Sequence, residues 1–156
     1  MSPLSRRSAL FLSLAALASC GRFSAGRREV SGPALHPGET PQLRTLINQY
    51  ADLYDVPPSL FHRVIQRESG YRANARNGPY YGLMQILPQT AGTMGFRGEP
   101  RDLLNADTNL KYAVKYLRGA WLLSDGSFDT AVKWYSQGYY YEAKRLGMLV
   151  ERGLRG

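Results

Sequence analysis

The chain has 156 residues, which is enough for one domain of ordinary size. With 44% apolar and 12% aromatic residues it is not a wholly disordered polymer, so a packed core is expected. The formal net charge of +8 suits any polyanion, whether nucleic acid, acidic lipid or an anionic cell envelope, and does not choose among them. The basic residues are scattered, without the dense Lys/Arg run that is typical of nucleic-acid-binding tails.

The first residues have the pattern of an export signal. Two adjacent arginines are followed by an uninterrupted run of apolar and small residues, 8–18. A run of this length matches the apolar region of a secretory signal and is too short to span a bilayer stably. It ends in Leu-Ala-Ser-Cys at residues 17–20, which resembles the lipobox of bacterial lipoproteins, where cleavage precedes the cysteine and the thiol is acylated. We therefore expect residues 1–19 to be a signal peptide and Cys20 to carry a lipid anchor in the membrane.

An ordinary signal peptide with an incidental cysteine is the alternative. Cys20 is the only cysteine, so it can form no internal disulfide in an oxidising compartment, and it stands where the apolar run stops. Both details favour a periplasmic, membrane-anchored lipoprotein, and an exported protein is not expected to bind nucleic acid. The sequence leaves open whether export uses the twin-arginine or the general secretory route, and which membrane holds the anchor.

The rest of the chain is predicted to be a tether followed by one helical domain. Residues 20–40 are rich in Gly, Ser, Pro and Arg without an apolar period, which is typical of a flexible tether. The domain, residues 41–156, begins with Thr40 as N-cap and Pro41 in the first turn of a helix. The apolar face of that helix is expected to contain Leu43, Leu46, Ile47, Tyr50, Leu53 and Tyr54.

Further helices are predicted from apolar spacing and from stop signals. Pro57-Pro58 separates the first helix from a second, which ends at Gly70. A short third helix starts near Pro88, and Asn105 or Asp107 caps a fourth. Residues 128–137 and 140–150 complete the set after a turn at 125–126, and residues 74–85 have room for a short extended segment. The apolar faces of the second and fourth helices are expected to carry Leu60, Phe61, Val64, Ile65, Leu110, Ala113, Val114, Leu117 and Trp121.

Glu68 breaks the pattern of an amphipathic helix. It follows Ile65 by three residues and Val64 by four, so it projects from the apolar face, in the last turn, where the helix dipole disfavours negative charge. Both effects raise a carboxyl pKa and keep the proton that general-acid cleavage of a glycosidic bond requires. The alternative, which helix geometry alone favours, is a structural glutamate paired with Arg63, Arg67 or Arg72.

Four motifs follow one another along the chain. They are Gln-Arg-Glu-Ser-Gly-Tyr (66–71), Tyr-Gly-Leu-Met-Gln-Ile-Leu-Pro-Gln-Thr-Ala (81–91), Asn-Leu-Lys-Tyr-Ala-Val-Lys-Tyr-Leu (109–117) and Ala-Val-Lys-Trp-Tyr-Ser-Gln-Gly (131–138). In this order and spacing they resemble the transglycosylase domain of the soluble lytic transglycosylases. The resemblance covers residues 41–147; each motif alone is weak, and the four together are specific.

The resemblance implies a mainly α, lysozyme-like domain with a groove for a glycan strand. It gives the role of catalytic acid to Glu68 and implies that Ser69 positions the reacting region. It also implies that the groove is lined by Gly82, Leu83, Met84 and Gln85, and that Tyr135 lies near the catalytic carboxylate. Departures from the family pattern are Ser136, Gln137, Ala113 and the pair Pro79-Tyr80, which concern substrate contacts rather than the acid.

The implied activity is cleavage of the β-1,4 bond between N-acetylmuramic acid and N-acetylglucosamine in peptidoglycan, with a 1,6-anhydromuramoyl product and no cofactor. Only one carboxylate belongs to a family motif, whereas Asp102, Asp107, Asp125 and Asp129 read as caps or turn residues. A hydrolytic muramidase of the same fold and a non-catalytic peptidoglycan-binding module are the alternatives. Protein partners, and attack at strand ends or interiors, stay open.

The remaining aromatic and histidine residues receive plainer interpretations. His36 lies in the predicted tether and His62 is expected on the outer side of its helix, so no metal site is predicted. Trp121 is expected in the core, and Trp134 in the core or the groove. Tyr80 and Tyr81 are sugar platforms or packing residues, and residues 139–141, three tyrosines, are a wall-binding edge or the start of a helix.

Overall fold

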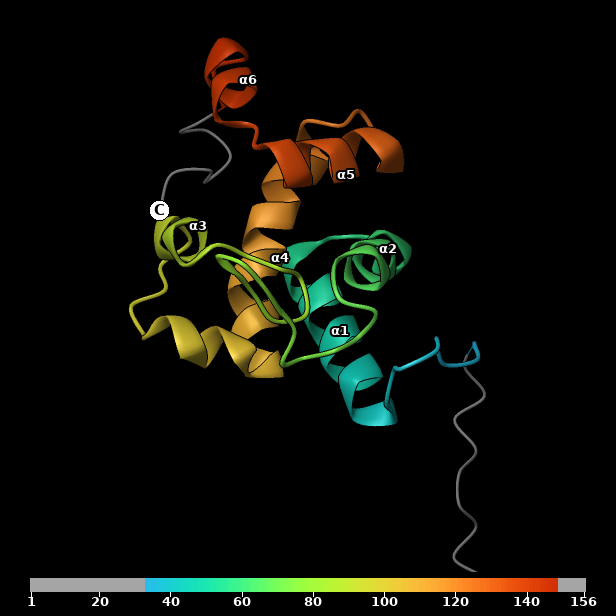
Figure 1. Ribbon diagram of the computed structural model, residues 1–156. Coiled ribbons are helices and arrows are strands. Elements are labelled where there is room, and N and C mark those ends of the chain that lie inside the picture. The colour runs from blue at the N-terminus through green and yellow to red at the C-terminus, as the bar shows by residue number, and fades with distance from the viewer. Residues whose placement is uncertain (1–32, 149–156) are drawn as a thin grey trace, which may run out of the picture. The chain divides into compact units, whose positions relative to one another are not determined.

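The computed structural model describes residues 33–148 and confirms a mainly helical domain (Figure 1). The predicted signal peptide and Cys20 lie outside the described residues. The elements are α1 (Pro41–Tyr54), α2 (Pro58–Glu68), β1 (Arg76–Asn77), β2 (Tyr80–Tyr81), α3 (Pro88–Thr93), the 3-10 helix η1 (Pro100–Leu104), α4 (Ala106–Leu122), α5 (Phe128–Gln137) and α6 (Tyr140–Arg145). None of the helices within residues 33–148 is long and apolar enough to cross a membrane.

Helix α1 begins and ends at strong local signals. The Thr40 side chain accepts a hydrogen bond from the backbone N–H of Leu43, as an N-cap does, and Asp55 ends the helix in the left-handed conformation. Ile47 is at the centre of the buried face. Leu53 was predicted to lie on this face, and that prediction was wrong, because the residue is 69% exposed. At 100° per residue, Leu53 lies about 120° around the helix axis from Ile47.

Helix α2 buries the four predicted apolar residues, and it also buries His62. The prediction that His62 lies on the outer side of the helix was therefore wrong. Its ring is covered by the chain that precedes α1, and its Nδ1 lies 2.9 Å from the hydroxyl oxygen of Tyr71. The apolar pattern of a helix cannot predict that a segment outside the helix will bury one of its residues.

Residues 33–40, which the sequence places in the tether, contact the domain. Glu39 is buried, and its carboxylate accepts two hydrogen bonds of 2.6 Å from the Arg44 guanidinium on α1. The backbone N–H of His36 donates a third, of 2.9 Å, to the same carboxylate. An ion pair and aromatic contacts, rather than an apolar stripe, hold this segment.

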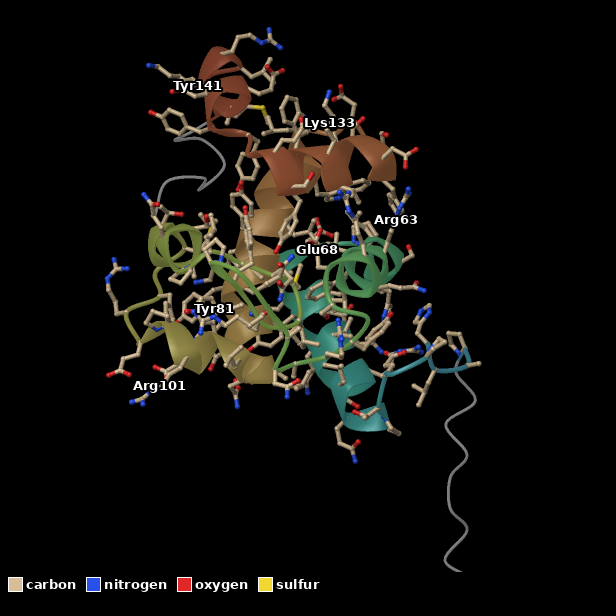
Figure 2. All side chains as sticks on the ribbon, in the orientation of Figure 1. Arg63, Glu68, Tyr81, Arg101, Lys133 and Tyr141 are labelled. Atoms are coloured by element: carbon tan, nitrogen blue, oxygen red, sulfur yellow. The ribbon has the colours of Figure 1, made fainter. Side chains whose placement is uncertain are left out.

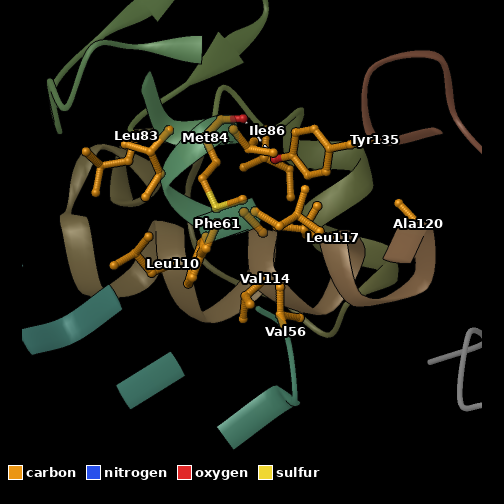
Figure 3. Packing of buried hydrophobic residues seen from close by; sticks show 14 of the residues in the cluster. Val56, Phe61, Leu83, Met84, Ile86, Leu110, Val114, Leu117, Ala120 and Tyr135 are labelled. Carbon is orange, nitrogen blue, oxygen red and sulfur yellow. Dashed lines mark hydrogen bonds between the residues drawn. The ribbon is translucent and has the colours of Figure 1, made fainter. Parts of the chain in front are cut away.

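Helix α4 is central to the packing, with contacts to α1, α3, α5 and η1. It runs through the middle of the view in Figure 1, with α5 at its upper end. Asn105 is its N-cap, because the side chain accepts from the N–H of Thr108, which decides between the two predicted caps. Its apolar residues pack against Phe61 and Met84 in the core (Figure 3). Trp121 is only partly buried and meets the edge of Phe128.

The short extended segment expected within residues 74–85 is the antiparallel pair of β1 and β2. Asp125 and Gly126 both have positive φ, which confirms the predicted turn before α5. Helix α5 has the predicted bounds, whereas α6 ends at Arg145, because Gly147 two residues beyond adopts a left-handed conformation. Residue 150, where this helix was predicted to end, lies outside the described residues.

Candidate active site

Glu68 is the last residue of α2. Ser69 is the C-cap, and Gly70 follows in the left-handed conformation with open space around it, so the chain turns away immediately after the carboxylate. The Glu68 side chain is 22% exposed. In Figure 2 it lies near the middle of the view, below α5. The end of the helix therefore presents a largely buried acid that still reaches solvent.

Burial raises the pKa of Glu68 above that of an ordinary glutamate, and the nearby charge of Arg67 opposes the shift. The Arg67 Nε lies 3.7 Å from Glu68 Oε1, an ion-pair contact without a hydrogen bond. The other two arginines that the sequence offered as partners are engaged elsewhere: Arg63 pairs with Asp129, and Arg72 donates to the backbone oxygen of Ser69. Glu68 is thus not locked in a structural salt bridge.

A cavity of about 310 Å³ lies between the loop after β2 and α5. Two predicted site residues, Gln85 and Tyr135, line it. Glu68 is not among the lining residues, but it is close enough to Tyr135 for its charge to affect the tyrosine's titration. The other lining residues are Tyr80, Ile86, Leu87, Thr90, Tyr116, Ser136, Gln137 and Gly138.

Tyr135 is a fixed wall of this cavity. Its hydroxyl donates a 2.8 Å hydrogen bond to the carbonyl oxygen of Met84 (Figure 3). Burial, together with the charge of Glu68, raises the tyrosine pKa well above its usual value, so the hydroxyl stays protonated. Tyr135 therefore joins α5 to the loop 82–85 as a permanent donor.

Gln85 has an uncommon backbone conformation, and one of its side-chain atoms is an unused hydrogen-bond acceptor. Its φ of 48° is left-handed, and its Nε2 donates to the carbonyl oxygens of Gly82 at 2.8 Å and Ala75 at 3.1 Å. Its Oε1 is buried and has no hydrogen-bond partner among residues 33–148. A buried acceptor without a partner is costly, so this oxygen is suited to a donor that a ligand brings.

The other predicted substrate-binding residues do not line the cavity. Leu83 and Met84 have fully buried side chains in the core. Ser69 is 3% exposed, and its hydroxyl is 3.4 Å from the carbonyl oxygen of Ile65. Gly82 has φ +75° and packs against α4. Gly82, Leu83 and Met84 therefore lie behind the lining of this cavity, and contact of these residues and of Ser69 with a glycan stays a prediction.

Asn109, to which the sequence analysis gave no role, organises this wall. The residue is fully buried at the start of α4. Its side chain donates to the carbonyl oxygens of Tyr81 and Leu103 and accepts from the N–H of Met84, at 2.8–3.0 Å. A Cβ at Gly82 would lie 2.3 Å from its Nδ2, so only glycine fits there. The sequence contained one signal of this role, since Asn109 is a polar residue next to the apolar face of α4 and belongs to one of the four motifs.

The family profile described as Transglycosylase SLT domain matches residues 45–145. The chain belongs to this family. The match covers α1 to α6 almost completely and includes Glu68, the loop 82–85 and Tyr135. The transglycosylase domain has a lysozyme-like helical fold, and its function is cleavage of peptidoglycan of the lytic transglycosylase type. No solved structure gave a significant match to the chain.

Three of the five positions that depart from the family pattern face the cavity of this transglycosylase domain, whereas Ala113 is buried in the core and Pro79 is not a lining residue. Ser136 and Gln137 on α5 line it, as does Tyr80 of β2, which is 42% exposed. Tyr81 instead packs beside Asn109, with the Arg76 guanidinium 4.8 Å from its ring centre. Tyr80 is therefore available as a sugar platform, whereas Tyr81 is a packing residue.

An aromatic cluster that the sequence analysis did not predict lies beside the cavity, and two of its members, Tyr116 and Tyr135, line it. The Tyr116 ring on α4 stacks on Tyr139, with centres 4.7 Å apart, and lies 5.4 Å from the ring of Tyr135. Tyr139 is 5% exposed, whereas Tyr141 is 84% exposed, so the three consecutive tyrosines have different roles. Trp134 is partly buried against the core and is not a lining residue of the cavity.

Of the four aspartates that were interpreted as caps or turn residues, Asp102 and Asp125 have such roles. Asp107 and Asp129 do not, because they lie inside the first turns of α4 and α5, whose N-caps are Asn105 and Ser127. Asp102 accepts from the N–H of Glu99, Asp107 accepts from the Tyr50 hydroxyl, and Asp129 pairs with an exposed arginine. Asp125 forms the turn before α5. Among residues 33–148, no second carboxylate contributes to the pKa shift of Glu68.

One cluster contradicts the expectation that neither histidine has a partner for a metal. His36, Glu39 and His62 each offer a ligand atom, and these atoms lie within 4.8 Å of one another. The cluster could not be read from the sequence because the segment that carries His36 was predicted to be a free tether.

Proposed function

We propose that this transglycosylase domain cleaves the β-1,4 bond between N-acetylmuramic acid and N-acetylglucosamine and leaves a 1,6-anhydromuramoyl end, with Glu68 as the only catalytic carboxylate. The observation that carries the proposal is a largely buried Glu68 with a raised pKa, close to the wall residue Tyr135. A protonated carboxyl group near neutral pH is what general-acid attack on a glycosidic oxygen needs.

The first step breaks the glycosidic bond. Glu68 donates its proton to the bridging oxygen, and N-acetylglucosamine leaves with that oxygen as a hydroxyl. The 2-acetamido oxygen of the muramoyl residue stabilises the positive charge at the anomeric carbon, as in the substrate-assisted glycosidases. This assistance replaces the second carboxylate of an ordinary glycosidase.

The second step closes the ring. The Glu68 carboxylate takes the proton of the muramoyl 6-hydroxyl, and the freed oxygen attacks the anomeric carbon and displaces the acetamido oxygen. Glu68 returns to its protonated form, and no water enters the product. The partial burial of Glu68 supports this route, because exclusion of water favours the internal hydroxyl over hydrolysis.

Tyr135 and Gln85 are proposed to contact the glycan at this site. Tyr135 offers a sugar only the small part of its side chain that reaches the cavity, because the residue is 7% exposed and its hydroxyl is occupied by the Met84 carbonyl. Gln85 offers a buried acceptor to a sugar hydroxyl or amide N–H. The reaction requires neither a cofactor nor a metal ion, because the acid, the base and the nucleophile come from Glu68 and the substrate.

The envelope location is a further part of the proposal. We propose that residues 1–19 direct export and that Cys20 is acylated, so that residues 20–32 hold the domain near the membrane on the periplasmic side. The support is the charged start, the apolar run and the lone cysteine in a lipobox-like sequence. Labelling with a radioactive fatty acid in cells tests it, with a Cys20→Ser chain as the matched control.

Replacing Glu68 by Gln tests whether the domain is an enzyme. Gln keeps the size and polarity of the side chain but supplies no acidic proton, so clearing of purified sacculi should fall by about a hundred- to ten-thousandfold. Circular dichroism should stay unchanged. A Glu68→Gln chain with full clearing activity would give the chemistry to another group, and a wild-type chain that binds sacculi without clearing them would be a binding module.

A further inference from the structure

Both histidines of the 156-residue chain meet in one cluster at the start of the domain. The rings of His36 and His62 have centres 4.9 Å apart, although 36 precedes α1 and 62 lies on α2. Glu39, with a fully buried side chain, is the third member. Solvent-exposed acidic clusters are common, but a buried carboxylate beside two imidazoles is the donor set of a transition-metal site.

We propose that His36, Glu39 and His62 bind one zinc ion, which fastens the segment 33–40 to α2. The three ligand atoms lie within 4.8 Å of one another, and His62 Nδ1 is 3.7 Å from Glu39 Oε1. Zinc forms bonds of about 2.0–2.2 Å to nitrogen and oxygen, so one ion bridges the closer pair without backbone movement. In the tetrahedral geometry that zinc prefers, two ligand atoms lie about 3.4 Å apart, so a pair at the 4.8 Å limit must approach by about 1.4 Å.

His36 is the ligand that can make this adjustment. It is partly exposed and precedes a turn at residues 37–38, whereas the other two ligands are buried in the domain. The Glu39 carboxylate is already oriented by Arg44 and by the backbone N–H of His36, as ligating carboxylates are in protein metal sites. Its Oε1 accepts only the Arg44 Nε hydrogen bond, which leaves a lone pair for the ion.

Two neighbours weaken the site. The Arg44 guanidinium is a fixed positive charge beside Glu39, and the Tyr71 hydroxyl hydrogen bonds with the same His62 nitrogen that faces the carboxylate. Zinc must displace that hydrogen bond and tolerate the arginine. We therefore expect affinity below that of a structural zinc site, and Tyr71→Phe, which removes a competitor, should leave zinc binding intact or tighten it.

An entry path and room for water ligands lie beside the cluster. A cavity of about 540 Å³ is lined by His36, Arg44 and His62, together with Pro33, Asn48, Pro58, Ser59, Arg63 and Gln66. An ion held by three protein ligands needs one more position for water, and this cavity supplies it. This cavity shares no lining residue with the cavity that contains Tyr135.

Because the chain has only two histidines, imidazole NMR gives a direct test. The sample is the untagged full-length chain in mild detergent, with Cys20→Ser so that the thiol cannot bind zinc, and with ¹⁵N-labelled histidine. During a zinc titration both imidazole signals should shift together and saturate at one ion per chain. Magnesium, which disfavours imidazole ligands, should shift neither.

Three variants separate a built site from surface binding. His36→Ala and Glu39→Gln should each weaken zinc binding at least tenfold, and the His62 signal in the first should no longer respond at the wild-type zinc concentration. Asn48→Ala, in the same cavity, should bind as the parent chain does. Zinc should also raise the melting temperature of the parent and not of His36→Ala, because an ion that binds only the folded state stabilises it.

The proposal is overturned if neither imidazole responds to zinc, if only one does, or if His36→Ala binds as tightly as the parent chain. Each of these results would mean that the cluster holds the segment 33–40 by hydrogen bonds alone and binds no ion. Such a result would not bear on the proposed catalytic role of Glu68, because that role is tested separately by the clearing of sacculi.

Discussion

The proton of Glu68 is subject to two opposing influences at the residue scale. Burial raises its pKa, and the Arg67 charge 3.7 Å away lowers it. A general acid works only while protonated, so activity should fall as pH rises through the Glu68 pKa. Arg67→Gln removes the lowering influence, so the pKa should rise and the alkaline limb of the pH–rate profile should move to higher pH.

Arg63→Gln is the matched control for this prediction. It removes the same charge from the same helix, but Arg63 pairs with Asp129 and does not affect the pKa of Glu68. The two profiles of sacculus clearing should therefore differ, with only Arg67→Gln displaced. An unmoved alkaline limb in Arg67→Gln would mean that a group other than Glu68 limits the rate at high pH.

The direction in which Glu68 points could be predicted from the sequence, because its signal is local, whereas its role as the acid was predicted only from the four motifs. An ionisable residue three and four positions after buried residues of its own helix must face the same way. The two histidines gave no such signal. His62 is buried by a segment whose attachment depends on the pairing of Glu39 with Arg44, and a composition rich in Gly, Ser and Pro conceals a pairing of this kind.

At the scale of elements, the loop between β2 and α3 depends on close approach to α4. Gly82 has φ +75°, and a Cβ there would lie 2.3 Å from both the Asn109 side chain and the Leu103 carbonyl oxygen. Gly82→Ala should therefore lower the free energy of unfolding by about 3 kcal/mol or more, because strain and steric overlap add. Urea denaturation followed by circular dichroism measures this loss.

Gly78→Ala separates the two contributions. Gly78 also has positive φ, of 57°, but nothing lies within 4 Å of the added Cβ. Its cost should be only the backbone term, about 1–2 kcal/mol. If both variants lose the same free energy, the tight contact between the loop and Asn109 does not exist in solution.

Element ends were predictable where the chain carries caps and prolines, as at Thr40, Pro58 and Asn105. The direction in which each side chain of the loop 82–85 points was not predictable. Three hydrogen bonds of Asn109 and one of Tyr135 fix which of these residues are buried and which line the cavity. Those contacts join segments far apart in sequence, so a motif could indicate where the site is but not which side chain meets the glycan.

At the scale of the whole molecule, the domain begins earlier than its family motifs. The profile match starts at residue 45, yet Glu39 is buried and bonded to Arg44. Deleting residues 33–40 should lower the free energy of unfolding by about 2–3 kcal/mol, since the hydrogen bonds to the charged Glu39 and the Thr40 N-cap of α1 are lost and apolar surface is exposed. Deleting 24–31, an equal length of predicted tether, should change it by less than about 0.5 kcal/mol.

Thermal unfolding of the two deletion chains makes this comparison. Equal melting temperatures would show that residues 33–40 behave as tether and that the ion pair with Arg44 adds nothing. A lower melting temperature for the 33–40 deletion alone would place the start of the folded unit at this segment.

The central claim is that one carboxylate and the substrate's own 6-hydroxyl complete the reaction. Mass spectrometry of muropeptides released from sacculi by the wild-type chain tests it most directly. The account predicts 1,6-anhydromuramoyl ends, one water lighter than reducing ends, and neither product from Glu68→Gln. Reducing muramoyl ends as the main product would contradict it, because water would then be the nucleophile.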